Sequence, residues 1–188
     1  MKLPIYLYGH PVLRAVSQDI TPDYPDLAAL IENMYETQYA SDGVGLAAPQ
    51  IGRNDRIIVI DASPLAETFP ELDGVKLTLI NPRLEVLDGD AVTRPEGCLS
   101  LPGLSENVSR VEHVRLQWVD EKFQPHDEEF SGFLARIIQH EYDHLEGKVY
   151  IDHISGIRKQ LIRSKLNNIV QGRIRCDYPV KYAPRHKK

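Results

Sequence analysis

The 188-residue sequence contains only two cysteines, no long hydrophobic run and no internal repeat. Two cysteines are too few for a disulfide framework, which favours a reducing compartment. No stretch approaches the roughly 20 apolar residues that a membrane-spanning helix needs. Residues 1–6 also lack the apolar core of a signal peptide. These absences exclude a disulfide-rich secreted scaffold and a membrane protein, so we expect a cytoplasmic protein.

The remaining composition suits one globular domain, because 188 residues that are 42% hydrophobic can bury a substantial core. Residues 26–41 repeat apolar side chains at helical spacing, with Pro25 in the first turn and Asp42 and Gly43 as a stop. This pattern predicts an amphipathic helix. Segments rich in β-branched residues predict strands over 56–60, 77–80, 83–87 and 111–119. Turn-forming residues predict a loop over 65–74.

Residues 140–144, which run His-Glu-Tyr-Asp-His, are the most informative segment. An α-helix advances about 100° per residue, so His144 lies about 40° round from His140 and both rings can reach one cation. Glu141 lies about 60° from His144, close enough to act as a general base without being a ligand. An exposed helix with ordinary polar groups is the alternative.

The residues before this motif favour a buried helix, because residues 133–138 are nearly all apolar. Ser131 is placed to cap its start and Gly147 to end it. Buried histidines and acids need a partner that neutralises them, and a divalent cation fulfils that need. The segment therefore predicts a metal-dependent hydrolase.

A third metal ligand must come from elsewhere in the chain. One known zinc-binding pattern extends this motif with a third histidine at the place that corresponds to residue 150. Residue 150 is Tyr here, so that pattern is excluded. After Glu146 the remaining acids are Asp152, close behind the motif, and Asp177 in a basic stretch. Cys98 is the best upstream candidate, since a thiolate binds zinc and ferrous iron strongly. A small buried hydrophobe is the alternative role for this cysteine.

Three blocks of sequence, residues 43–50, 96–100 and 139–147, together resemble peptide deformylase. The similarity runs from about Pro4 to about Gln171. It implies removal of the N-formyl group from formyl-methionine at the start of nascent polypeptides. It also implies one divalent metal ion, with Fe2+ the usual physiological ion and Zn2+, Ni2+ or Co2+ able to take its place.

The resemblance also implies a role for individual residues. It makes Cys98, His140 and His144 the metal ligands, with a fourth position open for water. Glu141 becomes the catalytic acid and base, while the Gln50 side-chain amide and the Leu99 N–H stabilise the oxyanion. Gln50 could instead simply close a turn after Pro49, and the Leu99 side chain could pack in the core.

A substrate pocket is expected beside this site. The absence of a Cβ at Gly43 and Gly45 lets an extended peptide lie against the chain, although turn chemistry is an alternative use of both glycines. Helix geometry places Phe133, Arg136 and Ile137 on or near the metal-facing side, where they line the methionine pocket or pack in the core. Arg136 would wall the pocket with its stem and keep its charge in solvent. The full expected set of substrate-binding residues is Gly43, Val44, Gly45, Gly97, Phe133, Arg136 and Ile137.

Two further positions concern the surroundings of the site. Glu96 and Arg110 are expected to pair and hold the cysteine loop, mainly because of the resemblance. Asp143 and Gln139 could support the metal ligands or lie at the surface, and the sequence does not separate these alternatives.

Strands gathered before the motif helix predict an α+β fold with mostly antiparallel sheets around a central metal-binding helix, with an N-terminal and a C-terminal helix. The resemblance implies the same fold. The C-terminal helix is expected over 155–170, with Ser155 as its cap and one face packed on the domain. We expect a catalytic domain over residues 1–171 and a basic tail over 172–188.

Charge is distributed unevenly along the chain. Residues 156–188 hold ten Lys or Arg and one acidic residue, whereas residues 1–155 hold twelve basic and 26 acidic residues. This asymmetry would draw the C-terminal part to a polyanion, and ribosomal RNA near emerging nascent chains suits the inferred substrate. A solvated helix or one paired with the acidic body is the alternative. No specific DNA binding is expected.

Two other functions remain compatible with the motif. One is a zinc endopeptidase or other amidase that uses the same helix, and it would need a third His or Glu ligand in place of Cys98. The other is a structural metal domain in which Glu141 has no chemical role.

Overall fold

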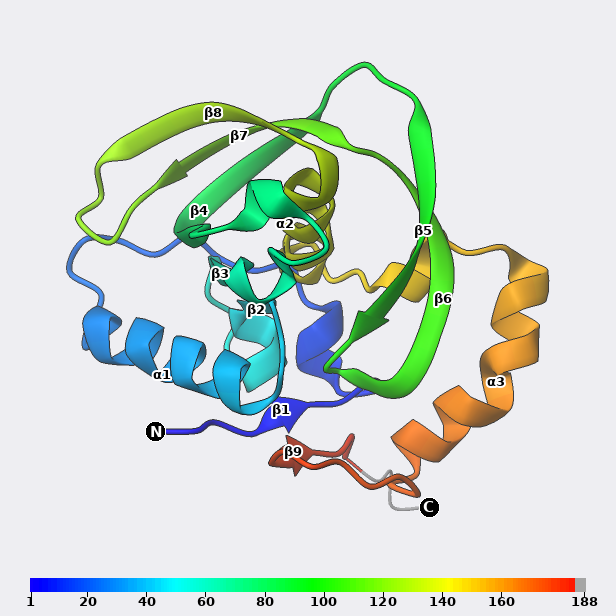
Figure 1. Cartoon of the computed structure of the whole chain (residues 1–188). Helices are drawn as coiled ribbons and strands as arrows, with labels where there is room; N and C mark the ends of the chain where they lie inside the picture. The colour runs from blue at the N-terminus through cyan, green and yellow to red at the C-terminus, as the bar shows by residue number, and fades with distance from the viewer. Residues whose placement is uncertain (185–188) are drawn as a thin grey trace.

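The computed structural model describes residues 1–184, which form three α-helices and nine strands (Figure 1). The helices are α1 (Leu27–Ala40), α2 (Gly132–Leu145) and α3 (Gly156–Val170). The strands are β1 (Ile5–Tyr6), β2 (Gly45–Ala47), β3 (Ile57–Asp61), β4 (Lys76–Val86), β5 (Ala91–Cys98), β6 (Leu101–Val111), β7 (His113–Val119), β8 (Pro125–Ser131) and β9 (Val180–Lys181). Residues 185–188, which hold Arg185, Lys187 and Lys188 of the expected basic tail, lie outside the described residues.

The strands form three sheets. The largest has the order β2-β3-β4-β7-β8 with every neighbouring pair antiparallel. Strands β5 and β6 form a separate antiparallel hairpin, and β1 pairs in parallel with β9. The predicted α+β class with mostly antiparallel sheets is therefore confirmed.

Strand β3 shows how the five-stranded sheet divides the core. Successive side chains of a strand point to opposite faces. Ile57 and Val59 accordingly join a cluster that includes Met34 of α1, whereas Ile58 and Ile60 join a second cluster. This second cluster includes Ile137, Ile138 and Leu145 of α2. Strand β3 is thus buried on both faces, by the cluster of α1 on one side and by that of α2 on the other.

Helix α2 lies between the large sheet and the β5–β6 hairpin (Figure 1). It packs against β2, β3 and β8. On its other side Gln139 donates to the Val111 carbonyl, 2.8 Å away, at the end of β6. Gly147 has a φ of +66°, a left-handed conformation that suits glycine just after a helix. Ser131 occupies the N-cap position as expected, but its side chain makes no capping hydrogen bond.

Several strand predictions were wrong in detail. The expected strands over 77–80 and 83–87 are one strand, β4, whose register shifts between Ile80 and Arg83. Asn81 adopts φ +51° there, and its side chain bonds both backbone groups of Ile20. The expected strand over 111–119 is split, because β6 ends at Val111 and β7 begins at His113. The expected loop over 65–74 contains the short 3-10 helix η4 (Pro70–Leu72).

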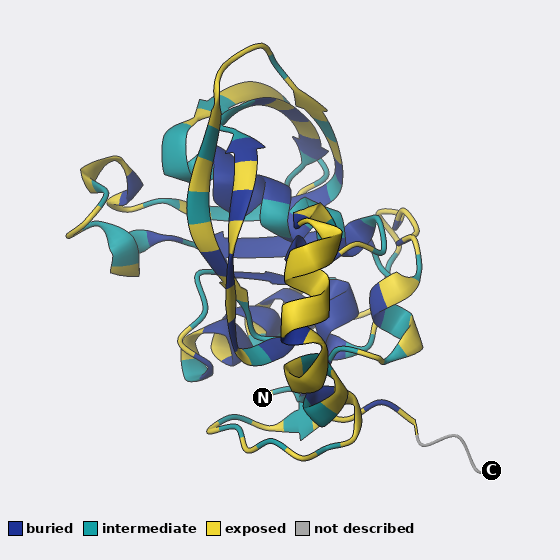
Figure 2. Ribbon diagram, turned by 90° about the vertical axis from the view of Figure 1, so that its right-hand side faces the viewer, coloured by how far each residue is buried: buried dark blue, intermediate teal, exposed yellow. Residues whose placement is uncertain are grey.

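The C-terminal helix α3 is capped as expected, since the Ser155 hydroxyl accepts a hydrogen bond from the Arg158 N–H. Only a narrow face of α3 packs on the domain, through Ile162 and Ile169 (Figure 2). Two apolar residues near its start, Ile157 and Leu161, are 76% and 66% exposed. Within residues 1–184, every helix is too short or too polar to cross a lipid bilayer.

Candidate metal centre

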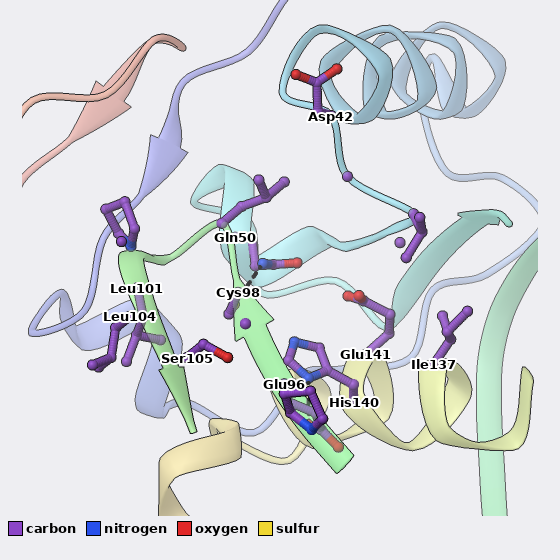
Figure 3. Close-up of a pocket in the computed structure, with 18 of the residues that line it drawn as sticks. Asp42, Gln50, Glu96, Cys98, Leu101, Leu104, Ser105, Ile137, His140 and Glu141 are labelled. Atoms are coloured by element: carbon purple, nitrogen blue, oxygen red, sulfur yellow. Dashed lines mark hydrogen bonds and ion pairs between the residues drawn. The ribbon is translucent and has the colours of Figure 1, made fainter. Parts of the chain in front are cut away.

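A cavity of about 670 Å³ opens where β2, β5, β6 and α2 meet (Figure 3). This is a typical size for a site that binds a small ligand. The structure brings all the predicted substrate-binding residues to its walls, namely Gly43, Val44, Gly45, Gly97, Phe133, Arg136 and Ile137. Gln50, Cys98, Leu99, His140 and Glu141 line the same cavity.

Cys98, His140 and His144 offer three metal-binding atoms that lie within 4.8 Å of one another. Cys98 ends β5 where the register shifts, and its Sγ lies 3.3 Å from Nε2 of His144. The two imidazoles project from consecutive turns of α2, with ring centroids 5.3 Å apart. Burial opposes the charged thiolate of Cys98, but the neighbouring His144 and His140 outweigh burial and lower its pKa. The thiolate is the form that binds metals.

Glu96 orients the His140 ring from the neighbouring strand. Its Oε2 lies 3.0 Å from His140 Nδ1, which leaves Nε2 of that ring to face the centre. Arg110 pairs with the same carboxylate at 2.7 Å, so the expected contact between Glu96 and Arg110 is confirmed. Burial alone would raise the pKa of Glu96, but the bonds from His140 and Arg110 hold it well below its ordinary value. A charged carboxylate behind a ligating histidine fixes the ring and increases its basicity.

The carboxylate of Glu141 is buried beside the three metal-binding atoms, with the residue only 5% exposed. Its Oε2 is buried and has no hydrogen-bond partner among the described residues. Burial raises the pKa of Glu141 to about 6. A buried oxygen without a partner requires an explanation, and a proton that it exchanges with a bound molecule would provide one.

Gln50 follows β2 in the short 3-10 helix η2 (Ala48–Ile51), and it is 2% exposed. Its Oε1 accepts a hydrogen bond of 2.9 Å from the Ala47 N–H. This contact fixes which end of the amide faces the cavity, because Nε2 then points to Cys98 Sγ and Ser100 Oγ, each 3.4 Å away (Figure 3). The donating end of Gln50 is thus directed at the centre.

Gly43 and Gly45 have different reasons to lack a side chain. A Cβ at Gly45 would lie 2.5 Å from Glu141 Oε1, so this glycine makes room for the carboxylate itself. A Cβ at Gly43 would lie 2.9 Å from the Leu99 side chain. The expected helix stop at Asp42 and Gly43 is confirmed, because Asp42 after α1 is left-handed at φ +55° and the Gly43 N–H donates back to the Gln38 carbonyl at 3.0 Å.

The expectation that Arg136 keeps its charge in solvent was wrong, because this residue is only 2% exposed. Its guanidinium donates to Glu96 at 2.7 Å and to Glu112 at 2.8 Å. Two carboxylates from distant parts of the chain, Glu96 on β5 and Glu112 between β6 and β7, therefore neutralise Arg136, and its position on the helix gave no signal of them. Asp143 pairs with Arg110 and His153, at 3.0 and 2.7 Å.

The sequence analysis did not predict that the C-terminal part of the chain reaches the cavity. Arg175, Cys176, Asp177 and Tyr178 all line it. It also missed Tyr150, whose ring stacks on His140 with centroids 6.0 Å apart. Tyr150 lies six residues after His144 beyond the end of the helix, and helix geometry does not extend there.

Comparison with known proteins places these features in context. The family model described as polypeptide deformylase matches residues 2–160. A peptide deformylase of Flavobacterium johnsoniae is 46% identical over 194 aligned positions, which cover 100% of this chain and 99% of that protein. That of Flavobacterium psychrophilum is 44% identical, with both chains covered completely.

Solved structures give the same comparison. The peptide deformylase of Thermus thermophilus shares 36% identity with a TM-score of 0.79, covering 89% of this chain and 97% of that chain. Peptide deformylase 1B of Arabidopsis thaliana, solved with an inhibitor, shares 31% identity with a TM-score of 0.80 and covers 91% and 92%.

Proposed function

Because this chain belongs to the peptide deformylase family, we propose that Cys98, His140 and His144 hold the metal ion of its reaction and that Glu141 moves the protons. The chain is an enzyme that hydrolyses the N-formyl group from the N-terminal formyl-methionine of nascent polypeptides and releases formate. The endopeptidase alternative finds no support in the family match. The observation that carries the assignment of residues is the convergence of three metal-binding atoms beside the unpartnered oxygen of Glu141.

The donor set fits the metal dependence of the family. One thiolate and two imidazoles accept both ferrous iron and zinc, and we place Fe2+ in the physiological enzyme, with Zn2+, Ni2+ or Co2+ able to replace it. When bound, such an ion lowers the pKa of water and polarises a carbonyl oxygen. Three protein ligands would leave a fourth coordination position for water or substrate, as a catalytic site requires.

Glu141 acts as base and then as acid. Its carboxylate takes a proton from the attacking water, and the resulting hydroxide forms a bond to the formyl carbon. Glu141 then gives the proton to the departing amine nitrogen as the C–N bond breaks, which releases formate. A pKa raised by burial to about 6 supports this role, because the group both accepts and releases a proton near neutral pH.

Gln50 and Leu99 stabilise the oxyanion that forms on the formyl oxygen. Gln50 Nε2 is directed at the centre by its contact with Ala47. Leu99 lines the same cavity, and its N–H has no backbone acceptor among residues 1–184. Losing one donor of this kind typically lowers the rate by about a hundredfold or more.

The cavity walls receive the substrate. Gly43, Val44 and Gly45 form the side along which an extended peptide backbone lies, and Gly97 allows close approach beside Cys98. The methionine side chain occupies the apolar end between Phe133 and Ile137. The buried Arg136 borders the pocket through its aliphatic stem.

The decisive test of this function is formate release. The protein is purified without oxygen, its metal content is measured, and it is incubated with a formyl-methionyl tripeptide. We expect formate in proportion to enzyme, and no acid release from the acetyl-methionyl tripeptide used as control. Metal-loaded enzyme that released no formate would contradict the assignment.

Substitution Gly45→Ala is expected to lower kcat by about a hundredfold, because the new methyl group displaces the Glu141 carboxylate from its reacting position. Metal content should stay the same, since the substitution does not touch the three ligands. Gly156→Ala is the matched control, because a Cβ at Gly156 meets nothing within 4 Å. Equal kcat in the two variants would show that the glycine at position 45 does not serve Glu141.

We further propose that the enzyme works in the cytoplasm and contacts the ribosome through the basic face of α3 and the residues after it. Arg163 and Lys165 are both exposed on α3. Cations on this surface would be attracted to RNA phosphates in a salt-dependent manner.

Charge reversal at Arg163 and Lys165 tests this contact. Wild-type enzyme should pellet with ribosomes less as salt rises, and the Arg163→Glu, Lys165→Glu variant should pellet much less at low salt. Reversal of Lys122, on the loop before β8, is the control and should leave pelleting unchanged. If the amount of enzyme that pellets with ribosomes changed neither with salt nor with the double substitution, this docking surface would be excluded.

A further inference from the structure

The chain after α3 returns to the body of the protein. It turns at Gly172, whose φ is +68°, and β9 then pairs in parallel with β1 (Figure 1). The Ile5 N–H donates to the Pro179 carbonyl at 2.8 Å and the Leu7 N–H to the Lys181 carbonyl at 2.9 Å. Residues 173–182, named here the return segment, are therefore anchored to the N-terminal strand.

The return segment reaches the catalytic cavity through Tyr178. Together with the three residues before it, Tyr178 lines the cavity that also contains Cys98 and Glu141. Its hydroxyl donates a hydrogen bond of 2.8 Å to the Leu99 carbonyl, in a partly buried position. Its ring packs against the core cluster that contains Leu101.

Leu99 lies in the short turn of the β5–β6 hairpin. Leu99 and Ser100 form the two-residue connection between β5 and β6, because Cys98 pairs with Leu101 across the hairpin. The Ser100 carbonyl accepts from the Tyr8 N–H at 2.8 Å, and the Leu99 carbonyl accepts from Tyr178. Both carbonyls of this turn are thus hydrogen-bonded to tyrosines near the two ends of the chain, Tyr8 through its N–H and Tyr178 through its hydroxyl.

The Leu99 N–H belongs to the peptide group between Cys98 and Leu99, whereas the Leu99 carbonyl belongs to the next peptide group, and the two groups are joined at the Leu99 Cα. Cys98 is held in β5 and the Leu99 carbonyl is held by Tyr178, so the Leu99 Cα is restrained from both sides and the movement of its N–H is limited. An oxyanion donor is effective only when it is aimed in advance at the position that the charge will occupy. A small misalignment of such a group lowers the rate markedly.

We infer that Tyr178 is a positioning residue for deformylation: the return segment, through the hydrogen bond to the Leu99 carbonyl, holds the Leu99 N–H aimed at the formyl oxygen. This inference rests on the proposed function of Leu99. It makes the C-terminal part of the chain a wall of the active site.

The experiment compares Tyr178→Phe with Tyr182→Phe. Tyr182 lies in the same segment and also donates to a carbonyl, that of Ile174 at 3.1 Å, but it does not contact Leu99. In zinc-loaded enzyme, Tyr178→Phe should lower kcat about tenfold with KM within about twofold, because the donor acts mainly in the transition state. Tyr182→Phe should retain wild-type kcat and KM. Thermal unfolding should show that both variants are folded.

The mobility of the Leu99 amide provides a readout that does not depend on turnover. In zinc-loaded protein without substrate, nitrogen-15 NMR relaxation should give a lower order parameter for the Leu99 amide in Tyr178→Phe than in wild type, and an unchanged one in Tyr182→Phe. Wild-type kcat and a wild-type order parameter in Tyr178→Phe, or equal losses in the two variants, would overturn the inference. A wild-type enzyme that released no formate would instead overturn the proposed function, while the relaxation measurement would still decide whether Tyr178 restrains Leu99.

Discussion

Glu141→Gln is expected to reduce deformylation by about 10³-fold or more while the metal ion stays bound, because general acid–base catalysis contributes up to about 10⁴-fold. The amide fills the same space beside Gly45 but takes no proton from water. The measurement combines formate release with metal analysis of the same sample. Glu128→Gln is the control, since this carboxylate is 58% exposed on β8 and should retain full activity.

The same substitution should also affect stability. Burial raises the pKa of Glu141, so the ionised carboxylate opposes folding once the pH exceeds the ordinary value for glutamate. In metal-free protein at pH 8, the neutral amide should therefore be at least as stable to urea as wild type. Full turnover in Glu141→Gln would contradict its role, and loss of metal from this variant would indicate a ligand instead of a base.

Cys98→Ala is expected to weaken metal binding by more than about a hundredfold and to remove activity with it, since losing even an outer-shell partner of a metal ligand typically costs about 10–100-fold. Gln50 loses one acceptor but retains Ser100, so the surrounding turn should persist. Competition with a coloured chelator measures the affinity. Cys176→Ala is the matched cysteine control and should bind the metal as tightly as wild type.

A Cys98→Ala enzyme that held stoichiometric metal would contradict the ligand assignment. If that variant also cleaved internal peptide bonds, a different ligand set would be at work. The comparison with Cys176→Ala separates these outcomes from general effects of losing a thiol.

The local part of the site could be predicted from the sequence, because helix geometry fixes residues that are close in the chain. The spacing of His140 and His144 places both rings on one side of α2, where the structure has them. The pairing of Cys98 with that helix depends on tertiary structure, and it was suggested by chemistry and by the resemblance.

Contacts between distant segments could not be predicted in this way. Nothing in the spacing of α2 indicated that Glu96 and Glu112 would neutralise Arg136, since these acids lie on other parts of the chain. Strands β5 and β6 contain Pro95, Gly97, Pro102 and Gly103, which interrupt the β-branched pattern used to predict strands. The hairpin that presents Cys98 was therefore missed as secondary structure.

For the C-terminal helix, the sequence predicted the secondary structure but not how much of its apolar face would be buried. Its apolar periodicity predicted the helix correctly, yet Ile157 and Leu161 are exposed, and most of the surface of α3 is open to solvent (Figure 2). A hydrophobic pattern identifies a face of a helix, but it does not specify how much of that face another element covers.

X-ray absorption at the metal edge of zinc-loaded enzyme tests the central claim most directly. The account predicts one sulfur ligand at about 2.3 Å, two imidazole nitrogens at about 2.0–2.1 Å and one further position filled from solvent. The sulfur contribution should vanish in Cys98→Ala and persist in Cys176→Ala. A spectrum of wild-type enzyme without sulfur, or one with four protein ligands and no open position, would contradict the account.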